Sequence, residues 1–235
     1  MDQFPTTPEG RNEKACANRA MFDRIAPRYD LLNRVISLGI DQRWRRRLVA
    51  LCEIAQGACC LDLCCGTGDV TRMLARQGAQ VVGLDASENM LAIARAHGGD
   101  GISYAQGDAL SLPYPDASFD AVTIAFGNRN VAGLDLLYRE MRRVTKPGGR
   151  VVSLEINRPS SALFAGLFFL YFTHIPVLLA RLFGAEATAY RYLPVSVRRY
   201  PSPEQVAEIM RASGLYAVEF ERHLGGIFVL HRGIA

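Results

Sequence analysis

The sequence predicts an α/β protein whose sheet is mostly parallel and has helices on both faces. Three observations support this fold class. Short apolar runs alternate with amphipathic stretches, a glycine-containing turn follows the first run, and the last two apolar runs are separated by only a few residues. Strands that alternate with helices form parallel sheets, whereas so short a link forces two strands to be antiparallel.

Five apolar runs are expected to form the parallel strands, at 59–64, 80–84, 102–105, 119–124 and 150–155. Apolar residues at helical spacing follow three of them, at 69–77, 88–96 and 134–144. Ser87 is a suitable N-cap for the second helix, and Lys146-Pro147-Gly148-Gly149 should end the third.

The alternation of strands and helices ends near the C-terminus. A helix at 203–213 precedes two β-rich runs at 216–223 and 227–232, and the link Leu224-Gly225-Gly226 is too short for a crossover helix. These two runs should form an antiparallel hairpin, which brings the sheet to seven strands. A parallel sheet closed in this way resembles the Rossmann-like fold of class I methyltransferases.

At 235 residues the chain is expected to form a single domain. Its predicted parts are an N-terminal helical segment at 11–51, a cofactor-binding core at 58–155, an apolar helical insert at 159–200 and the C-terminal helix and hairpin at 203–235. The insert has no charged residue from 159 to 180, and Thr173, His174 and Pro176 are expected to break it near its middle. A buried helix pair or lid, a helix that touches the membrane surface and a true membrane span are all compatible with it.

The charge pattern argues against a nucleic-acid partner. The net charge is +4, and no block of basic and aromatic residues forms a binding platform. The densest basic cluster, Arg43 to Arg47 around Trp44, is interpreted as a solvated helix face, with contact to an anionic membrane as the alternative. The first thirteen residues are polar and do not resemble a signal peptide.

The six cysteines are interpreted as reduced packing residues of a cytosolic protein. Four of them crowd one strand and its turn, where neighbours cannot form a disulfide framework. There is no pair of cysteines at zinc-ligand spacing and no nearby histidine, so no metal site is expected.

The turn after the first strand indicates a bound nucleotide-like cofactor. Gly66, Thr67 and Gly68 lead from strand to helix, which leaves backbone N–H groups facing a ligand. The dinucleotide pattern is not met, because Thr71 occupies the place of its third glycine. Asp62 and Asp69 flank the turn, and two carboxylates suit the cationic S-adenosylmethionine better than a pyrophosphate.

Ligands of open parallel sheets bind at the carboxyl ends of the strands. Asp85 ends the second strand, where a carboxylate can bind two ribose hydroxyls, although it could also be a charge at a helix N-terminus. Asp108 and Ala109 follow the third strand, where they could contact the adenine amino group or simply form a turn.

The loop after the fourth strand, 126–131, should point into the same crevice. Asn128, Arg129 and Asn130 could each be turn residues, but Arg129 is costly to place there without a partner. It is therefore the main candidate for contact with a substrate oxyanion. Glu155, at the end of the fifth strand, could face the cofactor amine or merely end the strand.

Several separate segments resemble the menaquinone and ubiquinone C-methyltransferase family. The resemblance covers nearly the whole chain and lies in these segments: 22–30, 33–39 with Trp44, Phe126-Gly127-Asn128-Arg129-Asn130-Val131, 144–150 through Leu154-Glu155, and His231-Arg232-Gly233. It implies S-adenosylmethionine as cofactor and a polyprenylated hydroquinone as substrate. The family's cofactor contacts fall on Thr67, Asp85, Asp108 and Ala109.

The chain departs from the family pattern at two places. Ala125 stands where the family often has Ser, and Asp41-Gln42-Arg43 replaces a stretch that often holds His. The turn sequence Cys-Cys-Gly-Thr-Gly-Asp is more similar to the menaquinone members than to the ubiquinone ones. The resemblance thus implies methylation of demethylmenaquinol to menaquinol, with the ubiquinone-pathway benzoquinol, or both, as the alternative.

A hydroquinone carbon becomes nucleophilic once its neighbouring hydroxyl ionises, so the enzyme needs alignment and help for a phenolic proton to leave. We expect Arg129 to stabilise the phenolate and Tyr29, Asp30 or His174 to lie near the ring. The apolar insert should hold the prenyl tail and contact the inner face of the membrane peripherally. A homodimer is compatible with the sequence, which does not determine the oligomeric state.

Two rival functions stay open at this point. The chain could methylate another apolar acceptor, such as a sterol or a phospholipid headgroup. It could also be a catalytically silent, cofactor-binding subunit of a quinone-biosynthesis assembly. The complete turn, Asp85 and Asp108 argue against the silent subunit.

Overall fold

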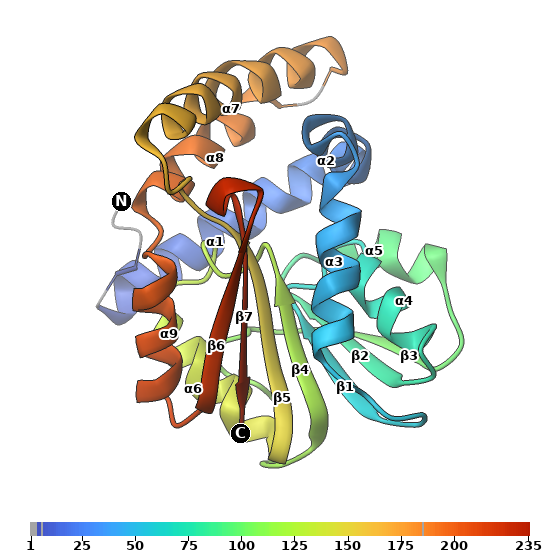
Figure 1. The fold of residues 1–235 in the computed structure, drawn as a ribbon. Helices are drawn as coiled ribbons and strands as arrows, with labels where there is room; N and C mark the ends of the chain where they lie inside the picture. Colours follow the sequence, from blue (N-terminus) through green and yellow to red (C-terminus); the bar gives the residue numbers. More distant parts are fainter. Residues whose placement is uncertain (1–3, 6, 185) are drawn as a thin grey trace.

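A computed structural model describes residues 4–5, 7–184 and 186–235, and in these residues the predicted sheet is confirmed (Figure 1). Its seven strands follow the order β3-β2-β1-β4-β5-β7-β6. The strands are β1 Cys59–Leu63, β2 Gln80–Asp85, β3 Ile102–Gln106, β4 Phe119–Ala125, β5 Thr145–Ile156, β6 Tyr216–His223 and β7 Phe228–Ile234. The first five are parallel, and β7 is antiparallel to both β5 and β6.

The sheet is covered on both faces because its central strands are apolar on both sides. On one face, Leu61 and Leu63 pack with residues of α6 (Leu134–Val144) and α9 (Pro203–Ala212). On the other face, Cys60 packs with residues of α3 (Ile40–Leu51), α4 (Asp69–Ala75) and α5 (Glu88–His97). Side chains that alternate along β1 therefore serve two separate cores.

Strand β5 begins earlier than the sequence suggests. Helix α6 ends at Val144 as expected, but Thr145 already pairs with Phe119 of β4. The predicted stop Lys146-Pro147-Gly148-Gly149 lies inside β5, at a register shift between Phe119 and Ala121 of β4. The glycines thus form an irregularity within a strand rather than a loop before it.

The N-terminal segment forms α1 (Pro8–Ile25), the short helix η1 (Ala26–Arg28), α2 (Tyr29–Ser37) and α3. Thr7 caps α1 by accepting a hydrogen bond from the Gly10 N–H group. Leu38 and Gly39 adopt left-handed conformations between α2 and α3, which lets the chain reverse sharply.

The insert forms two antiparallel helices, α7 (Ala162–Leu182) and α8 (Ala187–Arg199), above the carboxyl ends of the strands (Figure 1). The expected break at Thr173, His174 and Pro176 is wrong, because α7 continues through all three. Tyr171 connects α7 to α2, because its hydroxyl donates a hydrogen bond to the Ile36 carbonyl at 2.9 Å.

Helix α7 is long and apolar enough to cross a membrane by length and composition, with a mean hydropathy of 2.0 over its most apolar window. Only 17% of that window is buried. Phe168, Phe169 and Phe172 pack into the core, whereas Leu163, Leu167 and Leu170 are exposed. One side of the helix is therefore packed on the protein and the other is left uncovered by the described residues.

Candidate active site

Two cavities meet at the carboxyl ends of the strands. The first, called the turn cavity here, is lined by the turn after β1 and the ends of β2 and β4, including Gly66, Asp85 and Gly127. The second, called the apolar cavity, lies between α2, α3, α7 and β7 and includes Ile36, Phe168 and Phe228. Tyr29 and Phe126 line both cavities, so these two side chains stand where the cavities meet.

The turn after β1 folds around residues with positive φ. Cys64, Gly66 and Gly68 have φ angles of 50°, 55° and 87°, and α4 begins directly after Gly68. A Cβ atom on Gly68 would lie 2.3 Å from the Tyr104 hydroxyl, so only glycine fits there.

Asp85 connects the end of β2 to the turn. Its Oδ2 accepts a hydrogen bond from the Gly66 N–H at 2.8 Å, and its Oδ1 accepts one from the Ser87 N–H at 2.9 Å. Burial raises the pKa of Asp85, and these backbone donors oppose the shift. The carboxylate lines the turn cavity, so it can accept further hydrogen bonds from a ligand there.

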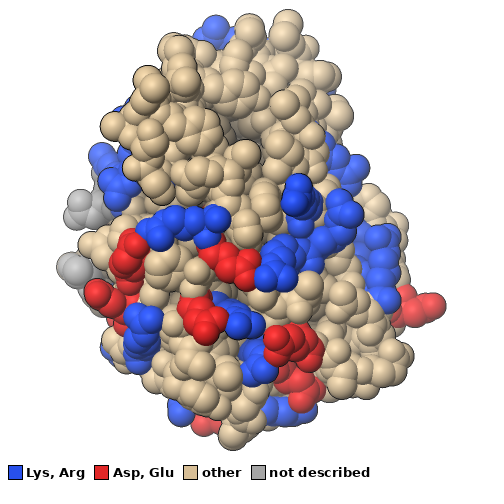
Figure 2. Space-filling model, viewed as in Figure 1, with Lys and Arg blue, Asp and Glu red and all other residues tan. Residues whose placement is uncertain are grey.

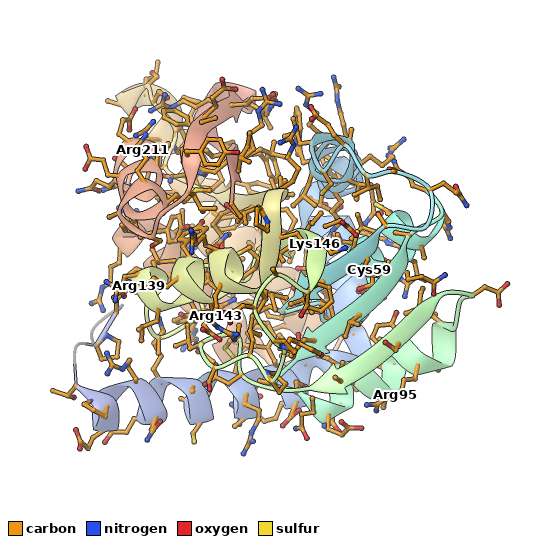
Figure 3. All side chains as sticks on the ribbon, turned by 90° about the horizontal axis from the view of Figure 1, so that it is seen from below. Cys59, Arg95, Arg139, Arg143, Lys146 and Arg211 are labelled. Carbon is orange, nitrogen blue, oxygen red and sulfur yellow. The ribbon has the colours of Figure 1, made fainter. Side chains whose placement is uncertain are left out.

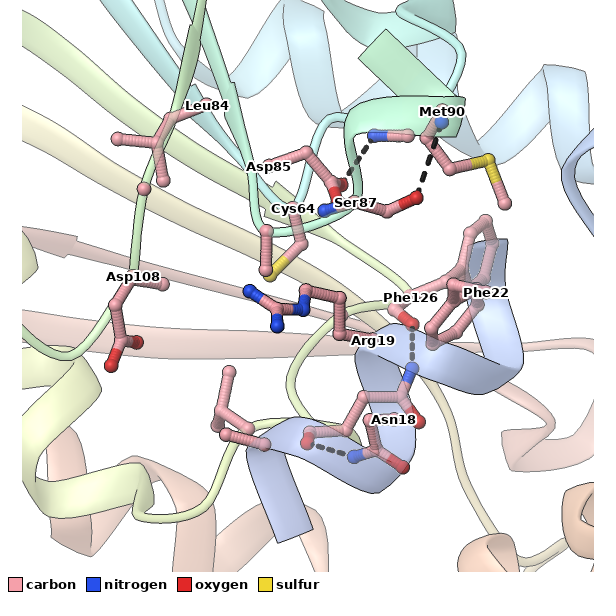
Figure 4. Close-up of a pocket in the computed structure, with 18 of the residues that line it drawn as sticks. Asn18, Arg19, Phe22, Cys64, Leu84, Asp85, Ser87, Met90, Asp108 and Phe126 are labelled. Atoms are coloured by element: carbon pink, nitrogen blue, oxygen red, sulfur yellow. Dashed lines mark hydrogen bonds between the residues drawn. The ribbon is translucent and has the colours of Figure 1, made fainter. Parts of the chain in front are cut away.

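Asp108 and Ala109 lie across the same cavity, at the end of β3 (Figure 4). Asp108 Oδ1 accepts a hydrogen bond from the Leu110 N–H at 2.9 Å, which holds the side chain in a tight turn. Leu84, Met90 and Leu110 supply an apolar wall. Carboxylates beside apolar walls suit a nucleoside, whose hydroxyls and flat base need both.

Asp62 and Asp69, the two carboxylates that flank the turn in sequence, do not line this cavity. Asp62 is buried below the turn and accepts hydrogen bonds from Thr71 at 2.7 Å and Thr123 at 2.8 Å. Burial raises its pKa to about 6. Asp69 binds Arg72 at 2.7 Å on the side facing α3. The carboxylates that face the cavity are Asp85 and Asp108, so the cationic-ligand argument rests on different residues from those expected.

Thr67 and Gly68 also lie outside the cavity lining. Thr67 is buried and donates its hydroxyl to Asp30 Oδ1 at 2.7 Å, while its carbonyl accepts a hydrogen bond from Arg72 at 2.7 Å. Their part in this structure is to shape the turn, and Gly66 is the turn glycine that faces the cavity.

Helix α1 covers the turn cavity, which the sequence did not predict. Asn18, Arg19 and Phe22 line the cavity, and Figure 4 shows the Arg19 side chain extending toward Cys64. Lys14 Nζ donates to the Val131 carbonyl at 2.6 Å and Asn18 donates to the Asn130 carbonyl at 2.5 Å. These two residues are four apart, so they share one helix face, which is the signal that could have indicated the contact.

Arg129 is buried and lines the apolar cavity. Its Nη1 donates to the Phe126 carbonyl at 3.0 Å and forms a very short ion pair with Glu155. The Arg129 N–H group also donates to Glu155 Oε2 at 3.1 Å. Burial opposes the charged guanidinium, but Glu155, Tyr29 and Tyr192 together outweigh it, and the pKa of Arg129 is raised. Glu155 therefore holds Arg129 in place and lines neither cavity.

The structure brings one of the other three expected catalytic residues, Tyr29, into the cavity lining, whereas Asp30 lies next to it and lines neither cavity. Tyr29 begins α2 at the junction of the cavities, where burial raises its pKa and the charges of Arg45 and Arg129 oppose the shift. Asp30 follows it and accepts the Thr67 hydroxyl. His174 lies exposed on α7 and lines neither cavity.

The basic cluster at 43–47 is not one uniform solvated face. Arg43, Arg46 and Arg47 are exposed, but Arg45 is buried and lines the apolar cavity. The sequence pattern could not separate them, because four arginines around one tryptophan give no clear amphipathic stripe.

All six cysteines are free. Burial raises the pKa of the thiols of Cys64 and Cys65 far above the ordinary value, so both stay protonated and poorly reactive. Cys59 is at the opposite end of β1, beside Lys146 at the amino ends of the strands (Figure 3). Among the described residues no group of three histidine, cysteine or acidic side chains could hold a metal ion.

Solved structures share this fold at low sequence identity. The [4+2]-cyclase SpnF matches with a TM-score of 0.69 and 19% identity, covering 100% of this chain and 98% of its own. The phosphoethanolamine N-methyltransferase 2 of Haemonchus contortus, solved with S-adenosyl-L-methionine, matches with a TM-score of 0.61 and 17% identity over 82% and 52% of the two chains. These likenesses establish the fold alone.

Curated relatives are much closer in sequence. A demethylmenaquinone methyltransferase of Deinococcus radiodurans is 48% identical over 209 residues, which are 87% of each chain. One of Thermus thermophilus is 45% identical over 91% of this chain and 99% of its own. The ubiquinone/menaquinone biosynthesis C-methyltransferase UbiE of Pseudomonas paraeruginosa is 38% identical over 98% and 93%. A model of the ubiE/COQ5 methyltransferase family matches residues 10–235, and the chain belongs to this family.

Proposed function

We propose that this protein transfers a methyl group from S-adenosylmethionine to a ring carbon of a polyprenylated hydroquinone, converting demethylmenaquinol to menaquinol. Family membership and the names of the relatives support the reaction class. The UbiE relative keeps the ubiquinone-pathway benzoquinol as the second candidate acceptor.

The observation that carries the proposal is the meeting of two unlike cavities at Tyr29 and Phe126. One cavity has carboxylates beside apolar walls, and the other is mostly apolar but includes a few polar side chains, among them Arg45 and Arg129. A methyl group has to pass directly from a polar donor to an apolar acceptor. Two cavities that share a wall allow the methyl group and the acceptor carbon to be aligned.

S-adenosylmethionine would supply an activated methyl group on its sulfonium in the turn cavity. Asp85 is suited to accept hydrogen bonds from the two ribose hydroxyls, and Asp108 and Ala109 are suited to the adenine edge. The Gly66 N–H is already taken by Asp85, which keeps that carboxylate oriented toward the cavity. The residues present therefore fit this cofactor.

In the apolar cavity, Arg129 and Tyr29 would act on the ring hydroxyl. Ionisation of a phenol with a pKa of about 10 is favoured by a nearby cation, which lowers that pKa. The ring carbon beside the oxygen would then form the new bond to the methyl carbon as the bond between sulfur and that methyl breaks, leaving S-adenosylhomocysteine. Loss of the proton on the ring carbon to water would restore the aromatic ring. Because Glu155 neutralises much of the charge of Arg129, we propose that Arg129 orients the phenolate as a fixed hydrogen-bond donor. Asp30 would position Tyr29 through the first turn of α2.

The apolar cavity would hold the first prenyl units and open to the membrane surface. Leu38, Leu167 and Leu224 come from three segments, line the cavity and are each about half exposed or more. Figure 2 shows a largely uncharged surface over the insert with a group of basic side chains below it. We propose that a cytoplasmic protein rests this surface on the inner face of the membrane, where anionic headgroups attract arginines.

Purified protein tests the function directly. It should methylate a short-chain demethylmenaquinol when S-adenosylmethionine is supplied, with the product detected by mass spectrometry. Complementation of strains that lack the methylation step of either quinone pathway then separates naphthoquinol from benzoquinol acceptors. Cofactor binding without methylation of any quinol would favour the silent subunit instead.

A further inference from the structure

We propose that Arg45 is a second acceptor-binding residue, which holds the quinol oxygen at the end of the ring away from Arg129. This inference rests on the proposed function and deepens it. It assigns one arginine to each of the two para oxygens of a hydroquinone, so the enzyme would recognise a diol rather than a single phenol.

The position of Arg45 supports this role. Arg45 belongs to α3, is only 9% exposed and lines the apolar cavity together with Arg129. Both arginines contact Phe126, but at different points. The Arg45 guanidinium lies 4.9 Å from the centre of the Phe126 ring, whereas Arg129 Nη1 donates to the Phe126 carbonyl. The two cations are therefore kept apart by one residue at the wall of the same cavity.

The surroundings of Tyr29 indicate that both charges act on the same place. Arg45 and Arg129 are the two cations that oppose the burial-induced rise in the pKa of Tyr29, and Arg45 is the stronger of the two. Since Tyr29 stands at the junction with the turn cavity, a ring placed for methyl transfer would also lie within the field of both arginines.

Arg45 has N–H groups that can donate hydrogen bonds to a ligand. Its Nε faces Asp41 at 3.3 Å and Asp69 at 4.0 Å, and in the part of the chain that the structure describes its two Nη groups donate no hydrogen bond to protein. A guanidinium has five N–H donors, so the Nη groups of Arg45 are available to a ligand in the cavity that this residue lines. A bound oxygen would satisfy two of them in the planar geometry that arginine provides.

The partners of Arg45 fix its direction. Asp41 accepts hydrogen bonds from Ser37 at 2.8 Å and Gln42 at 2.9 Å, and Gln42 also donates to Asp69 at 2.9 Å. These contacts hold both carboxylates at the Nε side of Arg45. A role confined to holding α3 against α4 would be served by this side alone and would not require the Arg45 side chain to line an apolar cavity.

The test compares acceptors with two and with one hydroxyl. Wild-type protein, Arg45→Gln and Arg45→Lys are assayed with a short-chain demethylated naphthohydroquinone and with its analogue that lacks the hydroxyl remote from the methylated carbon. We expect Arg45→Gln to raise KM for the diol roughly tenfold to a hundredfold, the loss of one charged hydrogen bond. KM for the mono-hydroxy analogue and the Kd for S-adenosylmethionine should stay nearly unchanged.

Arg46→Gln is the matched control, because Arg46 is exposed on the same helix and lies outside both cavities. This variant should leave KM for both acceptors unchanged. Arg45→Lys keeps the positive charge beside Asp41, so it replaces Arg45→Gln in the comparison if circular dichroism shows that Arg45→Gln is unfolded. Arg45→Lys should raise KM for the diol more than KM for the mono-hydroxy analogue.

If KM rose equally for both acceptors in the folded variants, the proposal would be overturned and Arg45 would be a structural residue. Failure of the proposed function looks different, since wild-type protein would then methylate neither acceptor.

Discussion

Thr67 and Asp30 connect the two halves of the site: the Thr67 hydroxyl of the turn donates to Asp30 Oδ1 of α2 at 2.7 Å. Tyr29, which precedes Asp30, stands at the junction of the cavities. A single hydrogen bond thus relates the position of the turn after β1 to the position of the residue at the junction of the two cavities.

Asp30→Ala should therefore impair catalysis more than folding. Losing one such hydrogen bond costs about 1 kcal/mol of stability, but displacement of Tyr29 should lower kcat at least about tenfold. Steady-state kinetics and thermal denaturation would measure the two effects. Asp100→Ala, at an exposed turn, is the control, and a kcat equal to that of wild type would remove Asp30 from the positioning role.

Asp85→Asn should weaken cofactor binding and leave acceptor binding intact. The amide keeps one acceptor oxygen but loses the negative charge, so Kd for S-adenosylmethionine should rise roughly tenfold to a hundredfold. Isothermal titration calorimetry measures this directly. The exposed Asp116 gives a matched control as Asp116→Asn, and an unchanged Kd in Asp85→Asn would contradict ribose binding by this carboxylate.

Asp62→Asn should make the protein more stable at neutral pH. Burial raises the pKa of Asp62 from 3.8 to about 6, so between these values the folded protein holds a proton that the unfolded chain has lost. The free energy of unfolding therefore falls as pH rises through this window, by roughly 3 kcal/mol in all, and this contribution is constant above it.

Urea denaturation at pH 4 and pH 7 tests this contribution. The change in stability between the two pH values should differ between wild type and Asp62→Asn, because other titrating groups are common to both. The asparagine amide can still bond to Thr71 and Thr123, whose hydroxyls both donate and accept. Identical pH dependence in the two proteins would show that Asp62 does not carry the shifted pKa.

Arg129→Met should damage both stability and activity, because it leaves Glu155 buried without its cation. Breaking a buried ion pair from one side costs about 3–5 kcal/mol. Adding Glu155→Gln to that variant removes the stranded charge and should restore most of the stability while activity stays lost. A double variant that regained turnover in the quinol assay would show that Arg129 serves folding alone.

Leu167→Glu together with Leu170→Glu should weaken binding to vesicles that contain anionic lipid. Both side chains are exposed, so the substitutions remove apolar contact with the bilayer and leave the core unchanged. Phe168 and Phe169 are unsuitable, since they are buried and a charge there would unfold the insert. Vesicle flotation measures binding, with Glu208→Gln, on exposed α9 surface, as the control; equal flotation of all three proteins would contradict a membrane-facing α7.

Local patterns in the sequence determined the order of strands and helices, the glycine turn and the antiparallel C-terminal hairpin. They also placed Asp85 and Asp108 after the right strands, because the carboxyl ends of parallel strands meet at one edge of a sheet. Each of these inferences depends on neighbours in sequence, and backbone geometry carries such information over short distances.

Tertiary packing decided what faces the turn. The sequence indicated that Asp62 and Asp69 flank the glycines and that Asp85 ends the second strand, but long-range partners decide which of them faces the cavity. Thr123 of β4 and Thr71 of α4 hold Asp62 below the turn, Arg72 and Gln42 turn Asp69 toward α3, and Asp85 is left to line the cavity. Likewise Arg45 differs from its exposed neighbours because it packs on Phe126 and faces Asp69 of α4. No pattern along one helix can show which other segment will pack against it.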